Sequence, residues 1–173
     1  MIIVLSGPIA SGKSTIAKRA ARLAGAHHAS FGDYVRHLAG SEGFSQRAVL
    51  RKIGQSLVET NPAGFVRDFL LFAKFHPGQP FIVDGLRHHS IWIELSKLAS
   101  ESHDKIFLAY VEIEAAIRRQ RLRDRGLTDI DIELIDDDPS EYDVLHILKA
   151  EANIVINGGG SADTAATLLI SEV

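Results

Sequence analysis

Short apolar segments alternate along the chain with longer stretches in which apolar residues recur every three or four positions. This alternation is typical of parallel β-strands joined by crossover helices, because both faces of such strands are covered. The first segment, residues 2–5, is entirely apolar, and three of its four residues are β-branched. We expect five strands, the second of them weak, at residues 2–5, 26–30, 81–84, 105–111 and 153–157.

The stretches between these segments have the spacing of amphipathic helices. Gly25 is a natural stop for the first helix, and Asn61-Pro62 supplies a cap and a first-turn proline for another. The expected helices cover residues 13–24, most of 44–75, 90–99, 112–125, a stretch ending at 150, and a last helix from Ala162 that Ser161 caps. Their expected apolar stripes are Ile16, Ala20, Leu23, Ala24; then Leu50, Ile53, Leu57, Val58; and then Phe65, Phe69, Leu70, Ala73.

The composition limits the class of protein without identifying it. With 173 residues, of which 24% are charged and 46% hydrophobic, the chain is expected to form one domain with a substantial core. A net charge of -3 argues against an extended nucleic-acid interface. The chain has no cysteine and no apolar stretch that could span a membrane, and because the first strand begins at residue 2 we expect no signal peptide. We therefore expect a cytoplasmic protein without a membrane partner, either a monomer or a homodimer.

The clearest chemical signal follows the first strand, where the chain reads Gly7-x-x-x-x-Gly12-Lys13-Ser14, the phosphate-loop pattern. The glycines let backbone N–H groups turn around an anion, Lys13 reaches the β- and γ-phosphates, and the Ser14 hydroxyl is placed to bind Mg²⁺. A glycine-rich turn that matches by chance is the alternative, but the flanking strand and helix favour a nucleoside triphosphate site. The expected ATP-binding residues of this loop are Gly7, Ala10, Ser11, Gly12, Lys13, Ser14 and Thr15.

A second candidate site lies at the end of the strand at residues 81–84. In a doubly wound sheet, ligands bind at the carboxyl ends of the strands, where we expect Asp84. An acid at this position can hold Mg²⁺, and Arg87 would project towards the same crevice. An aspartate that only stabilises a turn is the alternative. His27 and His28 lie on another expected strand and point to opposite faces, so we expect them to be structural.

Two groups of charged residues follow helical spacing. Asp33 and Arg36 share one side of a starting helix, either as a capping acid with a solvated partner or as part of the site. Five arginines occur within residues 118–125, which is more than the helix dipole requires. Because Arg121 and Arg125 are four positions apart, they lie on one face, and their guanidinium groups suit a transferring phosphoryl group.

Together with the phosphate loop, these patterns resemble the nucleoside monophosphate kinase group of P-loop proteins over nearly the whole chain. The likeness rests on Gly32-Asp33-x-Val35-Arg36 and Arg121-x-x-x-Arg125, and on Asp84-Gly85-Leu86-Arg87, which is one residue shorter than usual and lacks the usual proline. Residues 47–54 and a short lid look closest to phage-type deoxynucleoside monophosphate kinases.

The resemblance implies an α/β fold, a P-loop three-layer sandwich with a five-stranded parallel sheet flanked by helices. Residues 1–173 would form a single domain with a helical acceptor-binding insertion at 31–76 and a short lid region at 126–143. The stretch 127–143 is acidic, which departs from a typical lid. Such a run usually forms a solvated surface, and the alternative is a mobile lid that balances the arginines.

The resemblance also implies ATP-dependent phosphoryl transfer to a nucleoside or deoxynucleoside monophosphate, with Mg²⁺ as cofactor. The Asn157-Gly158 turn after the last strand occupies the position where that family binds the adenine, so both residues would lie against it. The implied roles are catalytic for Lys13, Arg121 and Arg125, acceptor-binding for Asp33, Arg36 and Arg87, and metal-binding for Ser14 and Asp84.

Two other functions remain open at this stage. One is a P-loop kinase with a hydroxyl acceptor such as dephospho-coenzyme A, in which Asp33 would be the general base because an alcohol must lose its proton. The other is a nucleotide-binding switch that does not turn over small molecules. The intact Lys13 and Asp84 and the paired arginines count against the switch, since a protein that only binds nucleotide needs no acceptor-side cations.

Overall fold

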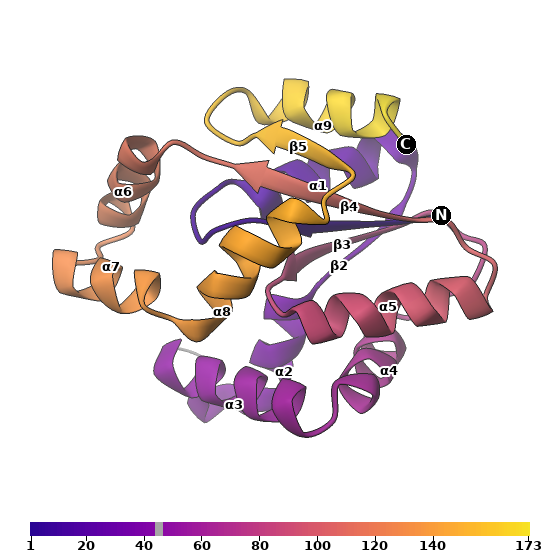
Figure 1. Ribbon diagram of the computed structural model, residues 1–173, viewed down its shortest axis with the longest axis horizontal. Coiled ribbons are helices and arrows are strands. Elements are labelled where there is room, and N and C mark those ends of the chain that lie inside the picture. Colours follow the sequence, from indigo (N-terminus) through magenta and orange to yellow (C-terminus); the bar gives the residue numbers. More distant parts are fainter. Residues whose placement is uncertain (44–46) are drawn as a thin grey trace.

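The computed structural model describes the backbone of residues 1–43 and 47–173 and the side chains of residues 1–40 and 54–173. Five parallel strands form one sheet in the order β2-β3-β1-β4-β5 (Figure 1). The strands are β1 (Ile2–Ser6), β2 (His27–Ser30), β3 (Phe81–Leu86), β4 (Ile106–Glu112) and β5 (Ile154–Asn157). The predicted five-stranded parallel sheet is therefore confirmed, including its weak second strand.

Helices cover both faces of this sheet and give the predicted three layers. Helices α1 and α9 pack against one another on one face. Helix α5, together with α2, α3 and α4, covers the other face (Figure 1). The helices are α1 (Lys13–Ala24), α2 (Phe31–Gly43), α3 (Arg47–Thr60), α4 (Pro62–Phe72), α5 (His89–Glu101), α6 (Ala115–Asp124), α7 (Asp129–Asp136), α8 (Pro139–Tyr142), the π-helix η1 (Asp143–Leu148) and α9 (Ala162–Ser171).

The alternation of side chains along β1 divides the core between the two faces. Ile2 and Val4 belong to the cluster on the α5 side, whereas Ile3 and Leu5 belong to the cluster beneath α1 and α9. All four side chains are at most 2% exposed, so β1 is buried on both faces as its uninterrupted apolar run predicts. The strand order reverses beside β1, which places the loop after β1 at the switch point where doubly wound sheets bind ligands.

Several predicted helix details are confirmed and others are wrong. Ser161 accepts a hydrogen bond from the Thr164 N–H at 3.4 Å and caps α9 as predicted. Helix α6 begins at Ala115 rather than at residue 112, because β4 continues to Glu112. Leu23 is 61% exposed, since the buried stripe of α1 consists of Ile16 and three alanines that allow close packing on the sheet.

The three helices between β2 and β3 pack around an aromatic cluster. The rings of Phe31 and Phe69 lie 4.1 Å apart between centroids, and Tyr34 meets Phe65 edge-on at 5.3 Å. The predicted stripe of α4, which includes Phe65 and Phe69, is thus confirmed, whereas Leu57 of α3 is 36% exposed. The predicted helical start at residues 44–46, and the side chains of Leu50 and Ile53, lie outside the described residues.

Candidate active site

The loop between β1 and α1 turns tightly enough to surround an anion. Gly7 has a φ of 144°, and a Cβ there would lie 2.5 Å from the Val111 carbonyl oxygen. Ala10 and Gly12 also have positive φ values of 70° and 96°. Such turns point successive N–H groups inward, and the N-terminus of α1 adds the positive end of its dipole. The Ser11 hydroxyl is buried in the loop and bonds to no described residue.

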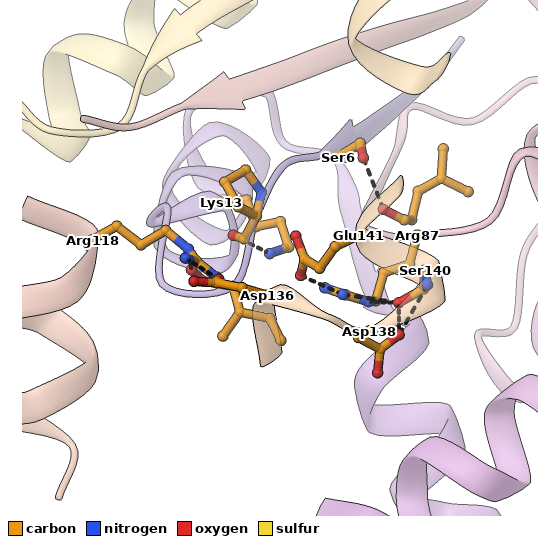
Figure 2. A network of polar contacts seen from close by, with 11 residues as sticks. Ser6, Lys13, Arg87, Arg118, Asp136, Asp138, Ser140 and Glu141 are labelled. Carbon is orange, nitrogen blue, oxygen red and sulfur yellow. Dashed lines mark hydrogen bonds and ion pairs between the residues drawn. The ribbon is translucent and has the colours of Figure 1, made fainter. Parts of the chain in front are cut away.

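Lys13 lies at this loop, where its Nζ donates a hydrogen bond to the Pro8 carbonyl oxygen at 3.0 Å (Figure 2). Burial is the main reason why the pKa of Lys13 is lowered from 10.5 to about 8. The positive charge of Arg87 lowers this pKa as well, while the carboxylates of Asp84 and Glu141 oppose the shift. The two carboxylates thus offset only part of the effect of burial and of the neighbouring cations, and the phosphates of a nucleotide would supply further negative charge.

Asp84 lies in β3, which continues two residues past it, and is 1% exposed. The His28 Nε2 is 3.3 Å from its Oδ2, and the Ser30 and Ser14 hydroxyls also bond to the carboxylate. Burial alone would raise the pKa of Asp84, but these hydrogen bonds hold the pKa below its ordinary value. Asp84 is therefore an ionised carboxylate beside the loop, and His28, which sequence analysis treated as structural, helps to orient it.

Ser14 and Asp84 fit the requirements of Mg²⁺. Both present oxygen, the hard ligand that Mg²⁺ prefers, and both line the cavity beside the phosphate loop. Among residues 1–40 and 54–173, no group of three His, Cys, Asp or Glu side chains could hold a metal by itself. The protein would thus supply only part of the coordination, as is usual for magnesium sites completed by phosphates and water.

Arginines of α6 contact the outer side of the loop. Arg121 Nη1 donates to the Ala10 carbonyl oxygen at 3.2 Å, and Arg118 Nε donates to that of Ile9 at 3.1 Å. Arg125, at the end of α6, lines the same cavity as Lys13. The structure therefore brings the predicted Arg121 and Arg125 to the loop. Sequence analysis missed Arg118 as a loop contact, and its only signal was membership of the arginine run.

The acidic stretch at residues 127–143 is not uniformly solvated. Ile132 and Ile135 are buried in a small apolar cluster that includes Ala10 of the phosphate loop, and Glu141 is 2% exposed. The prediction of a solvated surface is therefore wrong for these residues. The reason is that isoleucines at helical spacing anchor α7, while α8 carries Glu141 next to a partly buried cation.

That cation is Arg87, whose side chain is directed along α8 (Figure 2). Arg87 Nη2 donates to Glu141 Oε1 at 2.5 Å, and both Nη2 and Nε donate to Ser140 Oγ, at 3.0 and 3.1 Å. The side chains of Arg87 and Glu141 are 22% and 3% exposed. Arg87 thus lies at the expected crevice, but one side of its guanidinium group is held by protein groups.

A cavity of about 700 Å³ extends from the phosphate loop to the helices between β2 and β3. Lys13, Ser14 and Asp84 line one end, and Arg87 lies between the two ends. Gln55 supplies a polar group to the other end. The apolar walls of that end are formed by Phe31, Val35, Val58, Phe65, Leu86 and Ile91.

Arg36 and His88 border the apolar end of this cavity. Arg36 lines it and forms an ion pair with Asp33, which is itself 53% exposed and is not part of the wall. His88 also lines it, and burial, together with the charge of Arg87, lowers the pKa of His88. The structure therefore places the predicted Arg36 at the cavity, with Asp33 one side chain further out.

A smaller recess of about 200 Å³ lies on the other side of the loop and is lined by Gly12, Thr15, Arg121 and Gly158, among others. A Cβ on Gly158 would lie 2.0 Å from the Ser11 carbonyl oxygen, so the loop and the turn after β5 fit only with glycine there. The Asn157 side chain accepts a hydrogen bond from the Gly159 N–H at 2.8 Å. Gly158 thus borders the recess beside the loop, whereas the Asn157 side chain shapes the turn.

A phosphate loop after the central strand of a parallel sheet, with a buried aspartate on the adjacent strand, defines a P-loop nucleotide-binding domain. A family model described as AAA domain matches residues 3–147, so the chain belongs to the AAA domain family. A search of curated proteins finds no match.

Solved structures share the fold at low sequence identity. Shikimate kinase from Aquifex aeolicus is 16% identical with a TM-score of 0.60, over 99% of this chain and 94% of that one. The Mycobacterium tuberculosis APS kinase CysC, solved with AMPPNP and APS, is 15% identical with a TM-score of 0.61, over 99% and 95%. Shikimate kinase from Acinetobacter baumannii, in complex with shikimate, is 16% identical with a TM-score of 0.64, over 98% and 90%. The predicted P-loop kinase fold is thereby confirmed.

Proposed function

We propose that this protein transfers the γ-phosphoryl group of ATP to a nucleoside or deoxynucleoside monophosphate, giving the diphosphate. The observation that carries the proposal is the continuous cavity, which joins Lys13 and Asp84 to an apolar chamber bordered by Arg36 and Arg87. Phosphoryl transfer needs two substrates in line and neutralised charge, and a single cavity of this kind can supply both.

The loop end of the cavity suits the donor. Lys13 and the backbone N–H groups of the loop would bind the β- and γ-phosphates, and Arg121 and Arg125 would add positive charge from α6. Ser14 and Asp84 would hold Mg²⁺, which, when bound, neutralises phosphate charge. The recess beside Gly158 would receive the adenine.

The apolar end suits a planar base with a phosphate attached. Phe31 and Phe65 offer aromatic walls, while Arg36 and Arg87 offer guanidinium groups for the phosphate. A phosphate acceptor is already an anionic nucleophile near neutral pH, so no general base is needed. This agrees with Asp33, whose carboxylate pairs with Arg36 rather than pointing into the cavity.

A hydroxyl acceptor is the second candidate, and the shared fold with shikimate and APS kinases favours it. In that case the acceptor would be an alcohol, for example dephospho-coenzyme A. Asp33 would then have to leave Arg36 and act as the general base that removes the hydroxyl proton.

A coupled assay of ATP consumption tests both candidates. Each nucleoside and deoxynucleoside monophosphate is supplied as acceptor, with dephospho-coenzyme A, shikimate and APS in parallel. Arg36→Ala should raise the KM of the best monophosphate about 10- to 100-fold, since a charge-assisted contact contributes about 1.5–3 kcal/mol. The KM of ATP should not change. Arg22→Ala, which alters an exposed arginine of α1, is the control. Turnover confined to hydroxyl acceptors would reject the proposal. If Arg36→Ala raised only the KM of ATP, Arg36 would bind the donor rather than the acceptor.

A further inference from the structure

The contact between Arg87 and Glu141 is unusual because it buries a carboxylate within a site built for phosphate. Figure 2 shows α8 running past Arg87, with Ser140 and Glu141 both directed at its guanidinium group. Ser140 is itself fixed, since its hydroxyl donates to Asp138 Oδ1 at 2.7 Å. Neither partner is near Arg87 in the sequence, so the fold places them there.

These contacts use only part of the guanidinium group. A guanidinium has five N–H donors, and those of Arg87 that meet described residues belong to Nε and Nη2. Within the described part of the chain, the two N–H groups of Nη1 meet no acceptor, and Arg87 lines the cavity. A carboxylate that blocked Arg87 would bind both terminal nitrogens in the bidentate manner. Glu141 instead contacts Nη2 alone and leaves Nη1 available.

The Glu141 carboxylate also offsets the repulsion between the positive charges of Arg87 and Lys13. It acts on Lys13 in the sense opposite to Arg87, whose positive charge disfavours the Lys13 ammonium. Its side chain is 3% exposed, so little solvent screens these interactions. Without Glu141, Arg87 would lack a counter-charge, and repulsion from Lys13 would favour other side-chain conformations of Arg87.

We propose that Glu141 and Ser140 position Arg87 so that its Nη1 faces the cavity as a fixed binding group for an acceptor phosphate oxygen. The inference rests on the proposed function and deepens it, because it assigns acceptor affinity to a residue of the acidic stretch that touches neither substrate. Glu141 is thus a positioning residue, and Arg87 is the group that binds the acceptor.

The test uses inorganic phosphate as the probe, titrated by calorimetry into the full-length protein saturated with AMPPNP and Mg²⁺. Glu141→Ala and Arg87→Ala should each weaken phosphate binding about tenfold or more, the size expected for a charge-assisted contact. Glu141→Gln should restore part of this affinity, because its amide oxygen can still accept from Nη2 although it supplies no counter-charge. At pH 7 the affinity for AMPPNP should fall less than the affinity for phosphate, since the donor contacts are retained and only the charge that acts on Lys13 changes. Glu133→Ala, which removes an exposed carboxylate of α7, is the matched control.

Ser140→Ala keeps the test decisive should Glu141→Ala fail to fold, and it should weaken phosphate binding severalfold. The proposal is overturned if wild type binds no phosphate or if Arg87→Ala binds it equally well. Tighter phosphate binding by Glu141→Ala would show that Glu141 blocks Arg87. A Glu141→Gln protein as weak as Glu141→Ala, or equal losses of phosphate and AMPPNP, would also overturn it. Failure of the proposed function is read separately, as absence of turnover with every monophosphate.

Discussion

Lys13 should take up a proton when the protein binds ATP in mildly alkaline solution. In the ligand-free protein, burial lowers the pKa of Lys13 to about 8, so a growing fraction of this side chain is neutral above that pH. Bound phosphates favour the ammonium form and raise the pKa again. Without ligand, the lowered pKa means that folding favours the neutral form of Lys13. The Lys13 contribution to the free energy of unfolding is therefore fully present above pH 10.5, its ordinary pKa, and is lost as the pH falls through about 8.

The size of the effect follows from the pKa. At pH 9 about one tenth of Lys13 carries its proton before ATP binds, against about nine tenths at pH 7, for a pKa of about 8. If only the ammonium form binds ATP well, the affinity falls about tenfold between pH 7 and pH 9, or about 1.4 kcal/mol. Binding at pH 9 should then take up about 0.9 of a proton per ATP, and binding at pH 7 about 0.1.

Calorimetry in buffers with different ionisation enthalpies measures this proton uptake directly. Lys13→Ala should bind ATP weakly and take up no proton between pH 7 and pH 9. Lys18→Ala removes an exposed lysine of the same helix and should keep the wild-type pH dependence. A wild-type affinity that does not vary over this range would refute the reasoning, and so would proton uptake that persists in Lys13→Ala.

Two further substitutions test the geometry of the site. Gly158→Ala should weaken AMPPNP binding about 100-fold or more by calorimetry, because its Cβ would lie 2.0 Å from the Ser11 carbonyl oxygen and displace the loop. Gly160→Ala, whose Cβ meets nothing within 4 Å, is the control, and equal affinities of the two variants would contradict the argument. Asp33→Asn should lower the single-turnover rate about tenfold without changing the shape of its pH profile, since it weakens only the hold on Arg36. A loss of about a thousandfold, with disappearance of the acidic limb, would instead identify Asp33 as a general base and the acceptor as a hydroxyl.

The parts of the site that could be predicted from the sequence are those specified by residues close to one another along the chain. The phosphate loop needs positive φ values at Gly7 and Gly12 and a lysine directly after them, and all three lie within one short segment. Asp84 could be located because the carboxyl ends of the strands in a parallel sheet meet at one edge, where ligands bind. Four of the five strands followed in the same way from apolar runs, with the histidine-containing β2 as the exception, and the strand ends shifted by only one or two residues.

The contacts of Arg87 could not be predicted in this way. Its partner Glu141 is 54 residues away in the sequence, and nothing in the local pattern distinguishes this glutamate from the other acids of the stretch. A run of acidic residues predicts solvent exposure because most such side chains have no counter-charge. Which of them meets the partly buried Arg87 depends on how α7 packs through Ile132 and Ile135, a property of the folded chain.

The charge balance around Lys13 explains why a site for polyphosphate contains buried carboxylates. Among the described residues, the charged groups that act most on Lys13 are the guanidinium groups of Arg87 and Arg125 and the carboxylates of Asp84 and Glu141. Three cations with no counter-charge would repel one another at close range, and leaving them uncompensated in a partly buried site costs several kcal/mol. With two carboxylates present, the five groups carry a net charge of +1 when Lys13 is protonated. The ligand-free fold can thus keep its cations in place, while the remaining positive charge still attracts an anionic substrate.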